Sequence, residues 1–314
     1  MRIVFMGTPE PAKKILQALL DAKKEVVLVV TQPDRPKGRR LKVSKSPVKE
    51  LAEKVRISIE TPERVKDKIF IEKLKSIAPD IIVVAAYGKI LPKEILDIPK
   101  HGCINVHASL LPKYRGAAPI QWALMNGEKE TGVTIFRLKE TLDTGDIILQ
   151  KSIPIEDNDD AETLSGKLFD LGGKLLLEAI DLIENGKAEY KPQKEADASY
   201  AESLRKESGV IDWHKSAIDI HNRVRAMYPW PGAHTYYNGK ILKILKSEIK
   251  IVNLETKHKD PGTIIDVVKE LGFIVATGKG HILIKEVQPA GKKKMRAFDF
   301  CIGHNVKAGV VLPS

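Results

Sequence analysis

The 314-residue sequence predicts an α/β fold, with a Rossmann-like N-terminal domain followed by a C-terminal OB-like β-barrel domain. Three observations support this prediction. The chain opens with a strand, turn, helix and strand in succession, and its first apolar runs are of the continuous kind that parallel sheets bury on both faces. Its last third consists of short strands separated by turns. Because this length suffices for two hydrophobic cores, two domains are expected.

Strands and helices alternate along the first half of the chain. Apolar runs predict strands at 2–6, 25–31, 81–86, 103–107, 132–138 and 147–155. Helical spacing predicts helices at 10–22, 47–55, 65–77, 117–126 and 160–184, with a short one between Pro92 and Pro99. The first turn, Gly7-Thr8-Pro9, lacks the glycine fingerprint of dinucleotide sites, so hydride transfer is disfavoured.

The sequence pattern changes after the long helix. Residues 187–204 are polar and lose periodicity, which indicates a linker. Beyond it the sequence predicts a helix at 216–227 and short strands at 233–237, 241–249, 262–268, 272–276 and 281–287. The expected organisation is therefore a Rossmann-like domain at 1–189, a linker at 190–207 and an OB-like β-barrel domain at 208–314.

Charge and composition limit the classes of partner. Residues 205–314 carry 19 Lys and Arg against 10 Asp and Glu, a net charge of +9, whereas residues 1–204 carry only +2. Such a basic module is typical of contact with a polyanion, although a charged surface also serves solubility. No apolar run reaches the length of a membrane span, and the two cysteines form no metal-ligand pattern. A cytoplasmic protein with no membrane attachment and no metal is expected.

The segment at 32–46 is too long and too charged to be a plain connection. It is broken by Pro and Gly, and it holds six basic residues and one acid. Long basic loops commonly contact phosphate, and the alternative is a solvated surface segment. Ser46 and Pro47 supply an N-cap and a first-turn proline that anchor its end to the next helix. A second basic cluster, Lys292 to Lys294, has the same two interpretations.

The stretch 103–116 joins an apolar strand to polar groups. Because side chains alternate along a strand, Asn105 and His107 face the same side. An amide stabilises a developing oxyanion and an imidazole moves protons near neutral pH, which fits acyl or formyl transfer. The alternative is a hydrogen-bonded structural pair. Ser109 to Pro112 are expected to leave the sheet and to offer backbone groups and apolar surface to a flat ligand.

An acidic turn, Leu142 to Asp146, is a second candidate for site chemistry. An aspartic protease needs a second Asp-Thr-Gly copy for its carboxylate dyad, and the chain has none. Asp143 is instead expected to orient His107 and to stabilise its imidazolium. The alternative is that Asp143 only forms an Asx turn, and Asp146 is equally available to orient the histidine.

Several motifs, spread in order over nearly the whole chain, carry a family resemblance. They are Gly7-Thr8-Pro9, Thr31 to Pro36, Ala86-Tyr87-Gly88, Cys103 to Gln121, Glu130 to Thr134, Leu142 to Asp146, Ile211-Asp212-Trp213 and Pro229-Trp230-Pro231. Together they resemble the methionyl-tRNA formyltransferase family. The central run and the acidic turn are shared with other transferases that use formyltetrahydrofolate, whereas the Thr31 to Pro36 motif and the basic barrel are similar to the tRNA-directed enzymes.

The resemblance implies an enzyme of translation initiation that transfers the formyl group of 10-formyltetrahydrofolate to the α-amino group of methionyl initiator tRNA. By position it implies that Asn105, His107 and Asp143 are catalytic. It implies a folate site that includes Ser109, Leu110, Leu111 and Pro112. The basic loop resembles the element that enters the acceptor stem, so tRNA contacts are expected for Arg35, Lys37, Arg39, Arg40, Lys42 and Lys45, and on charge alone for Lys292, Lys293 and Lys294. A monomer is expected, and the group that takes the amine proton stays open.

Two other functions compete with this hypothesis. A formyltransferase for a small amine would use the same site, but it would not explain the positive charge of the predicted barrel. An RNA-binding protein whose first domain is a relic would have no reason to keep an amide, an imidazole and a carboxylate together.

Overall fold

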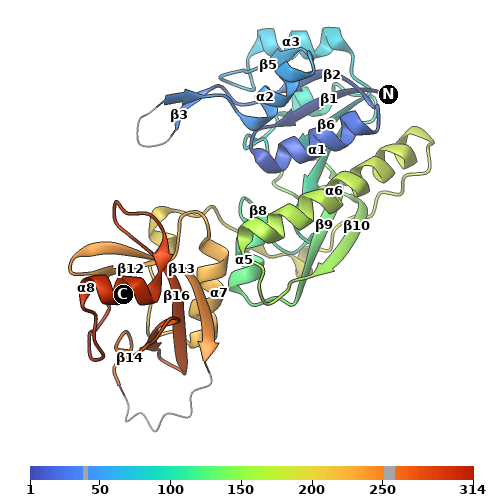
Figure 1. Cartoon of the computed structure of the whole chain (residues 1–314). Helices are drawn as coiled ribbons and strands as arrows, with labels where there is room; N and C mark the ends of the chain where they lie inside the picture. The colour runs from blue at the N-terminus through green and yellow to red at the C-terminus, as the bar shows by residue number, and fades with distance from the viewer. Residues whose placement is uncertain (38–41, 251–258) are drawn as a thin grey trace. The chain divides into compact units, whose positions relative to one another are not determined.

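The computed structural model describes residues 1–37, 42–250 and 259–314 (Figure 1). The chain divides into two compact units. Unit 1 comprises Met1–Pro119, Glu130–Pro154 and Ser165–Glu202, and unit 2 comprises Ile120–Lys129, Ile155–Leu164 and Ser203–Ser314. An α/β sheet in the first unit and an antiparallel sheet in the second confirm the predicted fold class.

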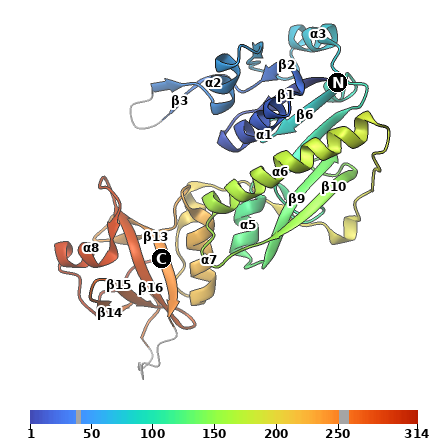
Figure 2. The same cartoon turned by 45° about the vertical axis from the view of Figure 1, so that its right-hand side comes forward.

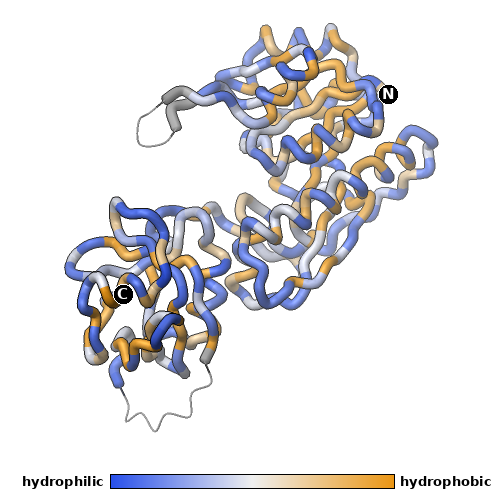
Figure 3. The backbone as a smooth tube through the Cα atoms, in the orientation of Figure 1, coloured by the Kyte–Doolittle hydropathy of each residue, from blue (hydrophilic) through white to orange (hydrophobic). Residues whose placement is uncertain are grey.

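Unit 1 is built on a seven-stranded sheet in the spatial order β10-β9-β7-β6-β1-β2-β5. Five neighbouring strands are parallel, and β9 and β10 run antiparallel at one edge. The strands are β1 (Arg2–Gly7), β2 (Glu25–Val30), β5 (Ile59–Glu60), β6 (Ile81–Ala85), β7 (Cys103–His107), β9 (Glu130–Arg137) and β10 (Ile147–Pro154). The central strands are strongly hydrophobic (Figure 3), as expected for strands covered on both faces.

Helices cover both faces of this sheet. They are α1 (Glu10–Asp21), α2 (Pro47–Lys54), α3 (Lys68–Ile77), α4 (Lys93–Leu96) and α6 (Ala161–Glu184). Helix α5 (Pro119–Met125) belongs almost entirely to unit 2. As predicted, Ser46 caps α2, because its Oγ accepts a hydrogen bond of 3.1 Å from the backbone N–H of Lys49. Figure 2 shows α6 running beside β9 and β10. Gly172 allows α6 to lie close to β7, since a Cβ there would lie 2.9 Å from a methyl group of Val106.

Two segments that the sequence predicts as irregular contain short strands. The basic segment includes a hairpin of β3 (Arg35–Lys37) and β4 (Lys42–Ser44), so its backbone is more regular than expected. The predicted linker includes η1 (Glu195–Asp197) and β11 (Tyr200–Ala201), and η2 (Lys206–Gly209) begins at its end. Strand β11 pairs in parallel with β8 (Arg115–Gly116). Strands of two or three residues have too few side chains to show a period, which explains why the pattern missed them.

Unit 2 is built on an antiparallel sheet in the order β12-β13-β16-β15-β14, with β17 beside β16. The strands are β12 (His234–Tyr237), β13 (Lys240–Lys250), β14 (Ile264–Val268), β15 (Gly272–Ala276), β16 (His281–Pro289) and β17 (Met295–Arg296). Helix α7 (Ala217–Met227) was predicted, whereas α8 (Ala297–His304) was not. Tertiary packing explains α8, because Ala297, Phe300 and Cys301 are buried in the core of this unit.

Trp213 is expected to be a large contributor to the stability of unit 2. Its side chain is fully buried in the unit's core, and its Nε1 donates a 3.4 Å hydrogen bond to Thr235 Oγ1. Trp213→Ala should therefore lower the free energy of unfolding by about 3–5 kcal/mol, measured by urea denaturation. Trp230→Ala is the matched control, because that tryptophan is 55% exposed. Equal losses from the two substitutions would contradict the prediction.

Candidate active site

The predicted strand at 103–107 is β7, with the same bounds. Strand alternation places Asn105 and His107 on the face of Cys103, which belongs to the core cluster beside α3 and α4, while Val106 faces α6. Burial raises the pKa of the Cys103 thiol to about 12, so it stays a neutral packing group. The polar chemistry of this face thus belongs to Asn105 and His107.

Asn105 is the one half-buried residue of an otherwise buried strand. Within the described part of the chain, its side-chain amide makes no hydrogen bond. Both of its N–H groups are therefore available to a ligand that approaches this face of β7. An amide donor held on a rigid strand and not used internally suits the stabilisation of an oxyanion.

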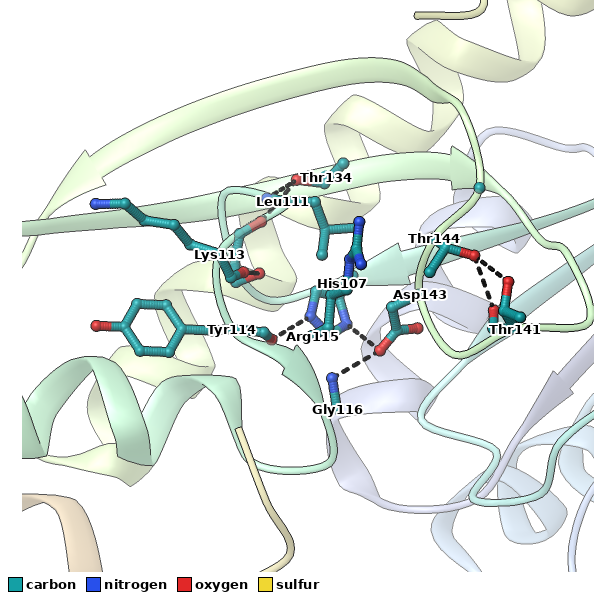
Figure 4. A network of polar contacts seen from close by, with 12 residues as sticks. His107, Leu111, Lys113, Tyr114, Arg115, Gly116, Thr134, Thr141, Asp143 and Thr144 are labelled. Atoms are coloured by element: carbon teal, nitrogen blue, oxygen red, sulfur yellow. Dashed lines mark hydrogen bonds and ion pairs between the residues drawn. The ribbon is translucent and has the colours of Figure 1, made fainter. Parts of the chain in front are cut away.

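His107 lies between two oxygen atoms, as Figure 4 shows. Its Nε2 lies 3.0 Å from the backbone carbonyl oxygen of Tyr114, and its Nδ1 lies 3.8 Å from Asp143 Oδ2. Since a carbonyl oxygen only accepts hydrogen bonds, Nε2 carries the proton of the neutral ring, and Nδ1 is the atom that can take a second one. The His107 and Asp143 side chains are 7% and 9% exposed, so little water screens their interaction.

A backbone N–H group fixes the position of the Asp143 carboxylate. Its Oδ2 accepts a 2.8 Å hydrogen bond from the backbone N–H of Gly116 (Figure 4). Its φ of 53° lies in the left-handed region, which aspartate tolerates better than most residues. Gly145 is required two residues later, because a Cβ there would overlap the carbonyl oxygen of Arg137. Asp146 pairs with Lys139 at 2.9 Å instead, so of the two aspartates it is Asp143 that faces the histidine.

The turn after β7 is fixed by polar side chains from the antiparallel edge of the sheet. Thr134 Oγ1 donates to the carbonyl of Ser109 at 2.7 Å and accepts from the N–H of Leu111 at 3.1 Å. Gln150 Nε2 donates to the carbonyl of Leu111 at 2.9 Å. Both backbone groups of Leu111 therefore have hydrogen-bond partners inside the protein, and backbone contact between the rest of this turn and a ligand stays a prediction.

The four residues predicted for the folate site differ in accessibility. Ser109 and Leu111 are buried, and Ser109 Oγ donates a 2.7 Å hydrogen bond to the carbonyl of Lys113. Leu110 and Pro112 are half-buried and keep surface that a ligand can reach. Leu110 and Pro112 are therefore the more accessible apolar groups of this turn, and folate contact stays a prediction for all four residues.

The predicted tRNA residues lie on the β3–β4 segment and in the turn between β16 and β17. Arg39 and Arg40 fall outside the described residues, and Arg35, Lys37 and Lys42 are described by their backbone in β3 and β4. Lys45 Nζ donates a 2.7 Å hydrogen bond to Glu53 Oε2, and this hydrogen bond raises the pKa of Lys45. Lys292, Lys293 and Lys294 are exposed, with Lys294 Nζ 3.6 Å from Glu286. Contacts with RNA stay a prediction for all nine residues.

Sequence reasoning missed the contribution of the predicted linker. Gln193, Glu195 and Ser199 all contact residues 114–116 or the Asp143 turn. The only local signal was Lys191-Pro192-Gln193, which is equally typical of a connection. In the described ranges, no group of three or more His, Cys, Asp or Glu side chains is placed to hold a metal ion. Nor does any helix of those ranges have the length and apolar character needed to cross a membrane.

Comparison with known proteins identifies the family. Residues 1–180 match the formyl transferase family, and residues 203–305 match the formyl transferase C-terminal domain. A methionyl-tRNA formyltransferase of Caldicellulosiruptor saccharolyticus is 51% identical over 317 residues, covering 99% of this chain and 100% of that protein. The chain belongs to the methionyl-tRNA formyltransferase family. A second formyltransferase of this name, from Caldanaerobacter subterraneus, is 49% identical over 316 residues, with coverage of 99% and 100%.

Two solved structures of lower sequence identity share the fold. WlaRD, a sugar 3N-formyl transferase solved in the presence of dTDP and 5-N-formyl-THF, is 24% identical with a TM-score of 0.65, covering 93% of this chain and 99% of that one. HypX from Aquifex aeolicus in complex with tetrahydrofolic acid is 19% identical with a TM-score of 0.66, covering 96% of this chain and 47% of that one. At these identities the likeness extends to the fold alone.

Proposed function

We propose that this protein transfers the formyl group of 10-formyltetrahydrofolate to the α-amino group of methionyl initiator tRNA. The observation that carries the proposal is the buried pair of His107 and Asp143 beside the unused amide of Asn105, at the end of one strand. The chain spans its methionyl-tRNA formyltransferase relatives from end to end, which supports the same acceptor.

The proposed reaction is an attack of the neutral amine on the formyl carbon. A bond forms between the amine nitrogen and this carbon, the carbonyl oxygen becomes an oxyanion, and the Asn105 amide donates hydrogen bonds to it. His107 Nδ1 takes the proton that the amine loses, and the Asp143 carboxylate stabilises the resulting imidazolium by Coulomb attraction. The bond from the formyl carbon to N10 of the folate then breaks, and N10 receives the proton from His107.

The remaining site assignments belong to the same proposal. Leu110 and Pro112 would provide apolar contact to the folate, while Ser109 and Leu111 shape the turn. The basic residues of the β3–β4 segment and of the β16–β17 turn would bind tRNA phosphates, which the net charge of +9 over residues 205–314 supports. We further propose that the protein acts as a monomer in the cytoplasm, with domain boundaries at residues 189 and 208.

Formylation of purified methionyl initiator tRNA by 10-formyltetrahydrofolate tests this function. Selective formylation of the initiator over methionyl elongator tRNA, weakening as salt rises, is the expected result, because phosphate contacts release counterions. The elongator tRNA and a small aminosugar nucleotide serve as matched acceptors. Formylation of the small amine with none of either tRNA would overturn the proposed acceptor and leave formyl transfer itself intact.

A further inference from the structure

Gln193 bridges the turn that carries Asp143 to a buried arginine. Its Nε2 donates to the carbonyl oxygens of Asp143 and Gly145, both at 2.8 Å, and its Oε1 accepts from Arg115 Nε at 3.1 Å. The amide thus uses both of its donors on the two sides of the Asp143 turn and its acceptor on the arginine. We infer that Gln193 is a positioning residue that holds the Asp143 carboxylate against His107.

The arginine end of this bridge is firmly anchored. Arg115 is 1% exposed, and its NH1 contacts both carboxylate oxygens of Glu195 at 3.0 and 2.9 Å. A buried guanidinium needs partners for its donors, and here Gln193 accepts from Nε and Glu195 accepts from NH1. Because Arg115 is fixed by burial and ion pairing, the Gln193 side chain is pinned between it and the turn.

Residues 114–116 contact His107, Asp143 and Gln193. Tyr114 accepts a hydrogen bond from His107, Arg115 binds Gln193, and Gly116 donates to the Asp143 carboxylate. Residues 199–201 hold this segment in turn, since Ser199 contacts the backbone N–H groups of Tyr114 and Arg115. The chain after α6 therefore supports the segment that bonds both the histidine and the aspartate.

The Asp143 turn needs an external brace of this kind. Asp143 adopts a left-handed backbone, and the carbonyl groups of Asp143 and Gly145 both accept hydrogen bonds from the single side-chain amide of Gln193. A carboxylate that must stand 3.8 Å from an imidazole loses effect if the turn shifts, and a misplacement of about 1 Å can cost about 100-fold in rate. Gln193 fits the role of limiting that shift.

Gln193→Glu removes the contacts with the Asp143 turn and keeps the contact with Arg115. The substituted side chain keeps the shape and still accepts from Arg115, but it loses both donors and turns an anion toward two carbonyl oxygens. We expect kcat for formyl transfer to fall about 10- to 100-fold, with KM for both substrates changing less than about threefold. Gln17→Glu is the matched control, because it makes the same chemical change at an exposed position of α1 whose partner is Asp21.

A double-mutant cycle combines Gln193→Glu with Asp143→Asn, and thermal melting of each variant accompanies it. The cycle distinguishes positioning of the Asp143 carboxylate by Gln193 from a contribution of Gln193 to overall stability. The inference rests on the proposed function, and it predicts that Gln193→Glu has little further effect on kcat once the Asp143 charge is gone. A full additional loss in that background, or wild-type kcat in Gln193→Glu alone, overturns the inference. Wild-type kcat in Asp143→Asn alone would instead overturn the proposed role of Asp143, and with it the need for a brace.

Discussion

Replacing His107 with alanine is expected to lower kcat for formyl transfer by about 10²- to 10⁴-fold, the range for loss of a general acid–base group. The proposed mechanism assigns the proton of the amine to His107 Nδ1, because Nε2 donates to the Tyr114 carbonyl and Asp143 Oδ2, 3.8 Å from Nδ1, would stabilise the imidazolium. Single-turnover formylation at saturating 10-formyltetrahydrofolate measures this step apart from substrate binding.

His214 offers a matched control for this experiment. Its Nδ1 also lies near a carboxylate, 3.2 Å from Asp212 Oδ1, but its side chain is 75% exposed. His214→Ala should therefore leave the single-turnover rate unchanged. A His107→Ala enzyme that formylates at the wild-type rate would show that the proton moves through another group, and the mechanism proposed for the pair would be wrong.

Loss of the Asn105 amide is expected to reduce kcat by about 10²- to 10³-fold, the usual effect of removing one oxyanion donor. Asn105→Ala removes the donor, and the half-buried position limits the accompanying loss of stability. The effect should appear in kcat more than in KM, because the donor is needed most when negative charge develops on the oxygen. Steady-state kinetics with varied donor and tRNA separates the two constants.

Asn105→Asp refines the interpretation of that result. The aspartate has nearly the same size but lacks N–H donors and adds negative charge where the oxyanion forms, so activity should fall at least as far as in Asn105→Ala. If Asn105 only fills space, Asn105→Asp should retain most of the activity. Unchanged turnover in both variants would exclude an oxyanion role for this residue.

Local pattern was sufficient for much of the fold. The strands β1, β2, β6 and β7 and the helices α1 and α6 agree with prediction to within a few residues, because their apolar periodicity is long or their flanking breakers are strong. Helix α8 has no comparable apolar stripe, and its burial against unit 2 decides its conformation. The hairpin of β3 and β4 and the pair of β8 and β11 are likewise set by pairing partners.

In the candidate site, too, local sequence pattern predicts some features and tertiary contacts decide the others. The placement of Asn105 and His107 on one face follows from the two-residue period of a strand, so the sequence by itself determined it. The choice of Asp143 over Asp146 required the tertiary structure, because only the folded turn shows which carboxylate reaches a histidine 36 positions away in the chain. Gln193 was beyond sequence reasoning altogether, since its role comes from hydrogen bonds to residues about 50 and 78 positions distant, and no local period or spacing encodes such contacts.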